Sequence, residues 1–354
     1  MTETASRYVH RRAVYDLVVD GKSINPAVDP RLISLRLTEK RGADADELEI
    51  VLDDRDGKLA IPPAGAVISL KLGWLDLASG ASPQLIDKGS FKVDGRRHGG
   101  TPDQLTLSAK SADLTRAFRT RRTQSWRDTT LGAVLGEVAS RNALQAAVAA
   151  EKAAITIDHL TQGRESDSAF LARLGRIHDA VATVKAGRLL FAAVGSGQTA
   201  GGQEIPGVTI TRRSGDRHAW EAAERENYSG VTVQWRDRRS ARTSSVTVGS
   251  AANARRLGKI YATEKAARQA ADSARSKQDR KVAKFSLDLA RGEPSLYPER
   301  TVTVSGFKPD IDGSAWLIVE AQHAMDAAGG LKTSLQMELN PPPATRSRSR
   351  QARS

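Results

Sequence analysis

The spacing of hydrophobic residues changes once within residues 162–191, and this stretch limits the possible folds more than any other stretch of the chain. The stretch opens with a polar turn, and Ser166 followed by Asp167 predicts a helix N-cap whose acidic residue suits the helix dipole. An apolar stripe with helical spacing follows, formed by Phe170, Leu171, Leu174 and Ile177. After Asp179 the period shortens to that of strands, and Gly187 supplies a turn between two of them. We therefore expect a helix followed by a β-hairpin, as in a mixed α and β domain.

The composition is that of a soluble protein. The chain has 354 residues, of which 39% are hydrophobic and 27% are charged, and this length suffices for two or three domains. No apolar run approaches the roughly 20 residues that span a bilayer, and residues 1–16 lack the apolar segment of a secretory signal. We therefore expect a protein of the cytoplasm in which it is made, with no membrane partner.

Residues that usually carry chemistry are absent or scattered. The chain has no cysteine, which excludes disulfides, thiolate metal sites and cysteine nucleophiles. No two histidines have the spacing of a helical zinc site, and neither a phosphate-binding loop nor a nucleophile elbow occurs. Residues 195–202 are glycine-rich and indicate a loop or linker, and residues 53–57 indicate a turn. We predict no catalytic, cofactor-binding or metal-binding residues and hence no enzyme; a pair of carboxylates distant in the sequence stays open as a hydrolase site.

The net charge of +13 permits binding to nucleic acid or to an acidic partner. Basic residues are frequent in an alanine-rich stretch at 262–284 and in the terminal residues 341–354. The first stretch predicts an exposed helix with alanine as its packing face, and the second predicts a disordered tail. No aromatic residues alternate with these arginines, so the stacking platform of a single-strand binder is missing. Binding to nucleic acid is therefore expected to be non-specific at most.

Changes in periodicity divide the chain into regions. Short strands between Gly, Pro and Asp turns suit a small barrel or sandwich in the β regions. Between them, Thr129 and Thr130 can cap a helix that runs from Leu131 toward Ala150, and residues 155–157 predict a short strand. Four domains result: a β region at 1–110, an α/β insert at 111–200, a second β region at 201–340 with the helix 262–284, and the basic tail at 341–354.

Short motifs in a fixed order resemble one family of proteins. The first group lies in the stretch described above: Gln162, Glu165–Asp167, Phe170–Leu171, Arg173–Leu174, Gly187 and Leu189–Phe191. Others lie on either side of it: Asp94–Gly95, Leu105–Leu114, Trp126–Leu135, Ala262–Ala271, Gly306–Phe307, Ile311–Leu317, His323 and Gly329–Leu335. Over residues 10–340 the chain resembles the phage late control D family, the tail hub protein of contractile-tailed temperate phages. That family is similar to the hub part of type VI secretion spike proteins.

The resemblance implies an α+β, mainly β fold with two small β-barrel domains, an α/β insert and a helical excursion in the second barrel. It also implies a structural role: three subunits with two related barrels each would form a ring of six-fold pseudo-symmetry. That ring would adapt the hexameric tail tube to the trimeric central spike and would need no catalytic group.

The partners implied are two further copies, the central spike, the tail tube or tube initiator, other baseplate proteins and the tape measure protein. The expected location is the baseplate of a virion tail or tail-like particle, assembled in the bacterial cytoplasm. Some hubs of the family carry a separate lysozyme domain, for which we expect this chain to have no room. Two alternatives stay open: a basic nucleic-acid-binding protein and a tail-associated cell-wall hydrolase.

Overall fold

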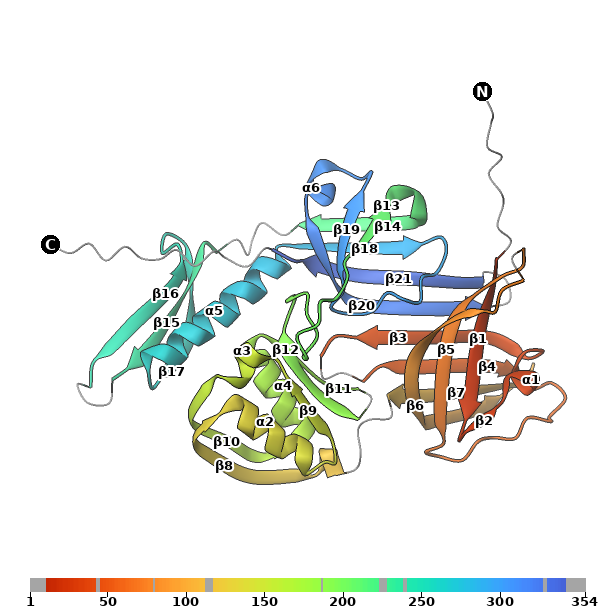
Figure 1. The fold of residues 1–354 in the computed structure, drawn as a ribbon, viewed down its shortest axis with the longest axis horizontal. Helices are drawn as coiled ribbons and strands as arrows, with labels where there is room; N and C mark the ends of the chain where they lie inside the picture. Colours follow the sequence, from red (N-terminus) through yellow and green to blue (C-terminus); the bar gives the residue numbers. More distant parts are fainter. Residues whose placement is uncertain are drawn as a thin grey trace.

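The computed structural model describes residues 11–42, 45–78, 80–111, 117–185, 187–222, 228–237, 241–326 and 330–341. Strands predominate in these residues, and the helices are fewer (Figure 1), which confirms the α+β, mainly β class. The predicted tail lies outside the described residues apart from Pro341. None of the described helices is both long and apolar enough to cross a membrane.

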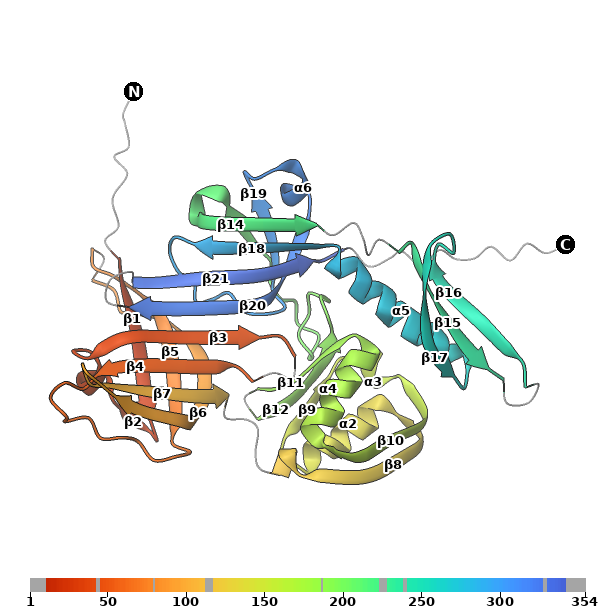
Figure 2. The same cartoon turned by 180° about the vertical axis from the view of Figure 1, so that it is seen from behind.

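One continuous sheet runs through both predicted β regions. Figure 2 shows eight of its strands stacked in order, each antiparallel to the next: β14 (Gly215–Ala222), β18 (Ala283–Leu289), β21 (Gly330–Leu339), β20 (Ala315–Asp326), β3 (Leu32–Lys40), β4 (Glu47–Asp53), β7 (Gln104–Ser111) and β6 (Gln84–Gly99). Further strands extend the pairing: β5 (Val67–Asp76), β1 (Arg11–Val19) and β2 (Lys22–Ser23) beyond β6, and β19 (Thr301–Ser305) with β13 (Val208–Thr211) beside β20. Two separate closed barrels are therefore not confirmed, because the pairing of the described strands stays open at β14 and β2.

The two β regions are joined where β20 pairs with β3. The ladder extends from Glu320 opposite Lys40 to Asp326 opposite Ser34. Side chains of a strand alternate between its two faces, and His323 and Met325 lie opposite Leu37 and Leu35 on the buried face. Backbone hydrogen bonds thus connect a strand near the start of the described chain to one near its end.

Each β region also has its own hydrophobic core. The first core centres on Phe91 and residues of β3, β4 and β5. The second packs Phe285 against Trp316, with ring centroids 5.2 Å apart. The indole Nε1 of Trp316 donates to the carbonyl of Ile311 at 3.0 Å, so its polar atom is satisfied inside the core. Short helices α1 (Asn25–Val28) and α6 (Pro309–Asp312) lie at the margins of these cores.

The insert contains the predicted helix, α4 (Asp167–His178). The Ser166 hydroxyl accepts the amide of Ala169 at 3.2 Å, which confirms the predicted N-cap. The helix packs on β11 (Ala180–Lys185) and β12 (Arg188–Ala193), which form the predicted hairpin around Gly187 with its positive φ of 70°. Ile177 is 37% exposed, so its predicted place in the buried stripe was wrong, and His178 lies buried instead.

Other expectations for the insert were only partly right. The strand predicted at residues 155–157 is confirmed at Thr156 and Ile157, but it continues as β10 (Thr156–Ser166), which pairs with β8 (Arg121–Thr130), so the polar turn expected at Gln162 was wrong. Helix α2 (Leu131–Ser140) begins at the predicted cap Thr130 but stops ten residues before Ala150. Ala143 takes a left-handed conformation with φ of 57°, and β9 (Gln145–Val148) then pairs in parallel with β12. Two short elements complete the insert: the 3₁₀ helix η1 (Ala117–Arg119) and α3 (Ala150–Ala153).

A small layered unit extends from the second β region and lies at the far end of the molecule from β1 (Figure 1). It consists of β15 (Gly230–Arg236), β16 (Thr243–Gly249) and β17 (Ala254–Tyr261), covered on one face by helix α5 (Glu264–Lys281). Ala267 and Ala271 are fully buried against Val231 and Val233, which confirms alanine as a packing face of this helix. The expectation of an otherwise exposed helix at 262–284 was wrong, because the helix ends at Lys281 and also buries Gln278 and Arg280.

Candidate functional site

The motif residues Gln162 and Asp167 meet at a buried polar cluster. Both side chains are fully buried. The Asp167 carboxylate accepts hydrogen bonds from Arg141 Nε at 3.0 Å, Asn142 Nδ2 at 2.7 Å and Gln162 Nε2 at 2.8 Å. Arg141 and Asn142 follow directly after α2, so the cluster attaches the end of α2 to the start of α4. Burial by itself would raise the pKa of Asp167, but hydrogen bonds from these partners outweigh it and hold the pKa below its ordinary value.

The remaining residues of the same motif pack around α4. The Arg173 guanidinium donates to Glu165 at 3.1 Å and lies over the ring of Phe170, 5.2 Å from its centroid. Trp126 stacks on the Phe170 ring with the two centroids 5.3 Å apart, and its Nε1 donates to Glu137 at 2.6 Å. Each polar atom named here has a partner within the insert, which indicates a packing role for the motif.

A second polar cluster joins the insert, the small unit and the continuous sheet. Arg280 of α5 donates to Asp179 at 2.9 Å and to Glu338 of β21 at 2.9 Å. Arg41, just after β3, pairs with Glu338 and also with Glu299. Glu299 accepts the amide of Gly195 at 2.8 Å, at the start of the glycine-rich loop. Burial raises the pKa of Glu299, because removing the carboxylate from water outweighs the attraction of Arg41.

A third buried cluster lies where β20, β3, β6 and β11 approach one another. Glu39 is 4% exposed and pairs with Lys88 at 2.5 Å, and its other oxygen is 3.9 Å from Lys185. His323 is fully buried: its Nε2 donates to the carbonyl of Leu296 at 3.1 Å and lies 3.3 Å from Glu39. Burial lowers the pKa of His323, so the ring is neutral near pH 7.

The charged side chains of these clusters are held by ion pairs within and between structural units. A cavity of about 640 Å³ opens beside the second polar cluster, and its two acidic lining residues, Asp179 and Glu338, are both ion-paired. Among the described residues, no group of three or more His, Asp or Glu side chains is placed to hold a metal ion. The predicted turn at residues 53–57 uses Asp56 to bind Arg31 at 2.6 Å. The absence of catalytic, cofactor and metal residues stays a prediction.

Sequence reasoning missed most members of these clusters. Arg41, Lys88, Arg280 and Glu338 carry no local signal, because a charged residue whose partner is far along the chain looks like a surface residue in the sequence. Gln162 was found only through the family resemblance, and Asp167 was predicted as part of the helix N-cap but not as a buried charge.

Comparison with known proteins agrees with this reading. The profile of the phage tail baseplate hub (GPD) family matches residues 86–329. The probable baseplate hub proteins of Escherichia phages P2 and 186 are both 38% identical to the chain, over 92% and 91% of its length and 92% of theirs.

Solved structures show the same fold. A tail protein from Neisseria meningitidis matches with a TM-score of 0.64 at 13% identity, covering 92% of this chain and 96% of its own. A 43 kDa tail protein of prophage MuSo2 from Shewanella oneidensis matches with a TM-score of 0.62 at 14% identity, covering 91% and 95%. Family profile and sequence relatives thus confirm the resemblance that the motifs indicated. The chain belongs to the phage tail baseplate hub (GPD) family.

Proposed function

We propose that this baseplate hub protein is a structural homotrimer whose subunits close a ring between the hexameric tail tube and the trimeric central spike. The observation that supports this most is the run of eight antiparallel strands from β14 to β6 within the continuous sheet, because unpaired backbone is available at both ends of this run. At one end β14 pairs only with β18 among the described strands. At the other end of this run, the residues of β6 from Gly95 to Gly99 pair with β7 but have no partner in β5, whose pairing with β6 stops at Lys92.

The number of strands favours closure between copies. With eight alternating strands, β14 and β6 run in opposite directions. A rotation about a ring axis keeps strand directions, so β6 of one copy would meet β14 of the next in antiparallel pairing. Such closure would cover two edges that would otherwise invite uncontrolled association.

The chemistry of the two ends suits an interface. Residues Asp216 to Ala222 of β14 are exposed, and Trp220 leaves 41% of its surface in solvent. The free part of β6 exposes Arg96, Arg97 and His98. An exposed tryptophan beside polar and oppositely charged residues is typical of interface centres.

We also propose a division into units supported by the separate hydrophobic cores. The four predicted domains at 1–110, 111–200, 201–340 and 341–354 are kept, and the small unit formed by β15, β16, β17 and α5 is added within the third, because it has a core of its own. Relatives carry the name of probable baseplate hub proteins, which supports a role without enzymatic activity. The proposed partners are the spike, the tail tube or tube initiator, other baseplate proteins and the tape measure protein, with assembly in the bacterial cytoplasm.

The natural absence of cysteine makes ring closure testable by cross-linking. Arg97→Cys on β6 and Ala219→Cys on β14 are combined in one chain and treated with a flexible bismaleimide. We expect covalent dimers and trimers and no larger species, while each single variant stays uncross-linked between these strands. Light scattering of the wild type, alone and with the spike, gives the native mass; a monomer under both conditions would argue against the ring.

A further inference from the structure

The two edges of the small sheet differ in how they are protected. Edge strand β17 has Arg255, Arg256 and Lys259, and basic side chains on an edge discourage pairing with further strands. Edge strand β16, with the sequence TSSVTVG, has neither a charge nor a proline and is rich in residues that favour strands. One edge of this sheet is therefore closed to new strands, and the other is open to them.

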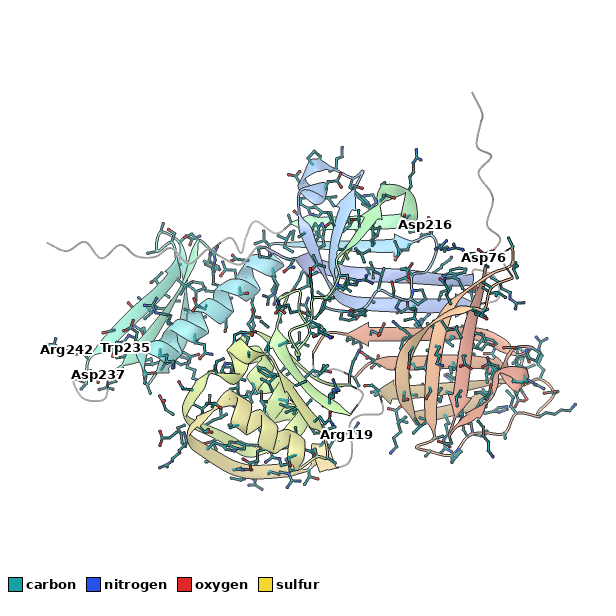
Figure 3. All side chains as sticks on the ribbon, viewed as in Figure 1. Asp76, Arg119, Asp216, Trp235, Asp237 and Arg242 are labelled. Atoms are coloured by element: carbon teal, nitrogen blue, oxygen red, sulfur yellow. The ribbon has the colours of Figure 1, made fainter. Side chains whose placement is uncertain are left out.

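Strand β16 is held firmly on its inner side only. Among the described strands it pairs with β15 alone, from Val248 opposite Val231 to Thr243 opposite Arg236. Val246 is 5% exposed and points into the unit, whereas Ser244 and Ser245 are exposed. The position is remote, since Figure 3 places Trp235, Asp237 and Arg242 at the tip of this hairpin, far from the continuous sheet. A fourth strand could be added here without displacing any described element.

The charge of the small sheet favours an acidic partner strand. Among the described residues, the hairpin of β15 and β16 carries Arg236 and Arg242 against Asp237, and three more basic side chains, Arg255, Arg256 and Lys259, lie on β17 at the far edge of the same sheet. The chain's own residues 342–354 contain four arginines and no acidic residue, so like charge disfavours them as the occupant. Like charge equally disfavours the same unit of a second copy.

We propose that β16 binds an extended, acidic segment of another protein, which adds to the small sheet as its fourth strand. Backbone hydrogen bonds along Thr243–Gly249 would provide the affinity, and carboxylates near Arg236 and Arg242 would provide the selectivity. The assignment of that segment to another tail protein rests on the proposed function; strand addition does not.

The test uses the purified full-length chain and two synthetic peptides with the same Val and Thr alternation, one carrying Glu and the other Lys at the remaining positions. Fluorescence anisotropy should show binding of the Glu peptide only, weakening as salt rises. Ser245→Glu, which places a like charge against the Glu peptide on β16, should reduce that affinity by about tenfold or more. Gly258→Glu is the matched control, since it adds the same charge to exposed β17 in a position with no atom near its Cβ; it should leave most of the binding.

Hydrogen exchange supplies a readout independent of folding defects in the variants. In the wild type, the Glu peptide should slow exchange of amides in Thr243–Gly249, as only strand pairing would do. Equal binding of both peptides, equal loss in both variants, protection elsewhere, or no binding at all would overturn the proposal. If the Glu peptide does not bind while the wild type is still a trimer, strand addition at β16 is refuted and the proposed hub function is unaffected.

Discussion

Replacing Asp167 with asparagine tests whether the motif acts through its buried charge. The change keeps the volume and one acceptor oxygen but removes the negative charge that Arg141, Asn142 and Gln162 surround. Deleting one partner of a buried ion pair costs about 3–5 kcal/mol. The Arg141 side chain is 17% exposed, so water can partly compensate it. We therefore expect Asp167→Asn to lower the free energy of unfolding by about 2–4 kcal/mol at pH 7.

The pH dependence follows from the depressed pKa of Asp167. A carboxyl whose pKa is lower in the folded state contributes stability above its unfolded pKa of about 3.9. That contribution is lost as the pH falls through the folded pKa. The difference between wild type and Asp167→Asn should thus be full at pH 6–7 and shrink below about pH 4.

Urea unfolding at one fixed protein concentration measures the effect, because subunit association would otherwise change apparent stability. Hydrogen exchange in α4 shows that the loss is local. The control is Asp158→Asn on the exposed face of β10, expected to stay within about 0.5 kcal/mol of wild type. An Asp167→Asn variant as stable as this control, or an Arg141→Ala effect that simply adds to it, would refute the reasoning.

Two further predictions concern the contacts that α5 makes with the insert and with β21. Arg280→Ala should lower the free energy of unfolding in urea by about 3–5 kcal/mol, since it leaves Asp179 and Glu338 without their shared partner. The control Arg275→Ala breaks a more exposed pair on the same helix and should cost under about 1 kcal/mol; similar losses in the two variants would contradict a special role for the buried pairs of Arg280. Burial, with smaller contributions from nearby lysines, lowers the pKa of His178 to about 4, so stability should fall as the pH drops from about 6.5 toward 4, by about 2–3 kcal/mol. His178→Gln should flatten this dependence in pH-resolved urea unfolding, and an unchanged slope would show that other groups cause it.

Local structure was predictable where it depends on residues that lie close together in the sequence. Ser166 caps α4 because its hydroxyl reaches an amide three residues later, and Gly187 turns the hairpin because it tolerates a positive φ. The helix expected to reach Ala150 was wrong because a good helical composition could not show that residues 145–148 pair with β12. Strand β14 was missed because nearly all its residues are exposed and mixed in polarity, so it has no alternation to detect.

By itself the sequence determined the mainly β class, the capped helix and hairpin, and, through motifs in a fixed order, the hub family. The tertiary structure alone decided that β20 joins β3, so that the two β regions share one open sheet. It also decided that Arg41 meets Glu338 and Arg280 meets Asp179. The physical reason is distance along the chain: caps and turns depend on neighbours within a few residues. The partner of a strand edge or a buried charge depends on how the whole chain packs.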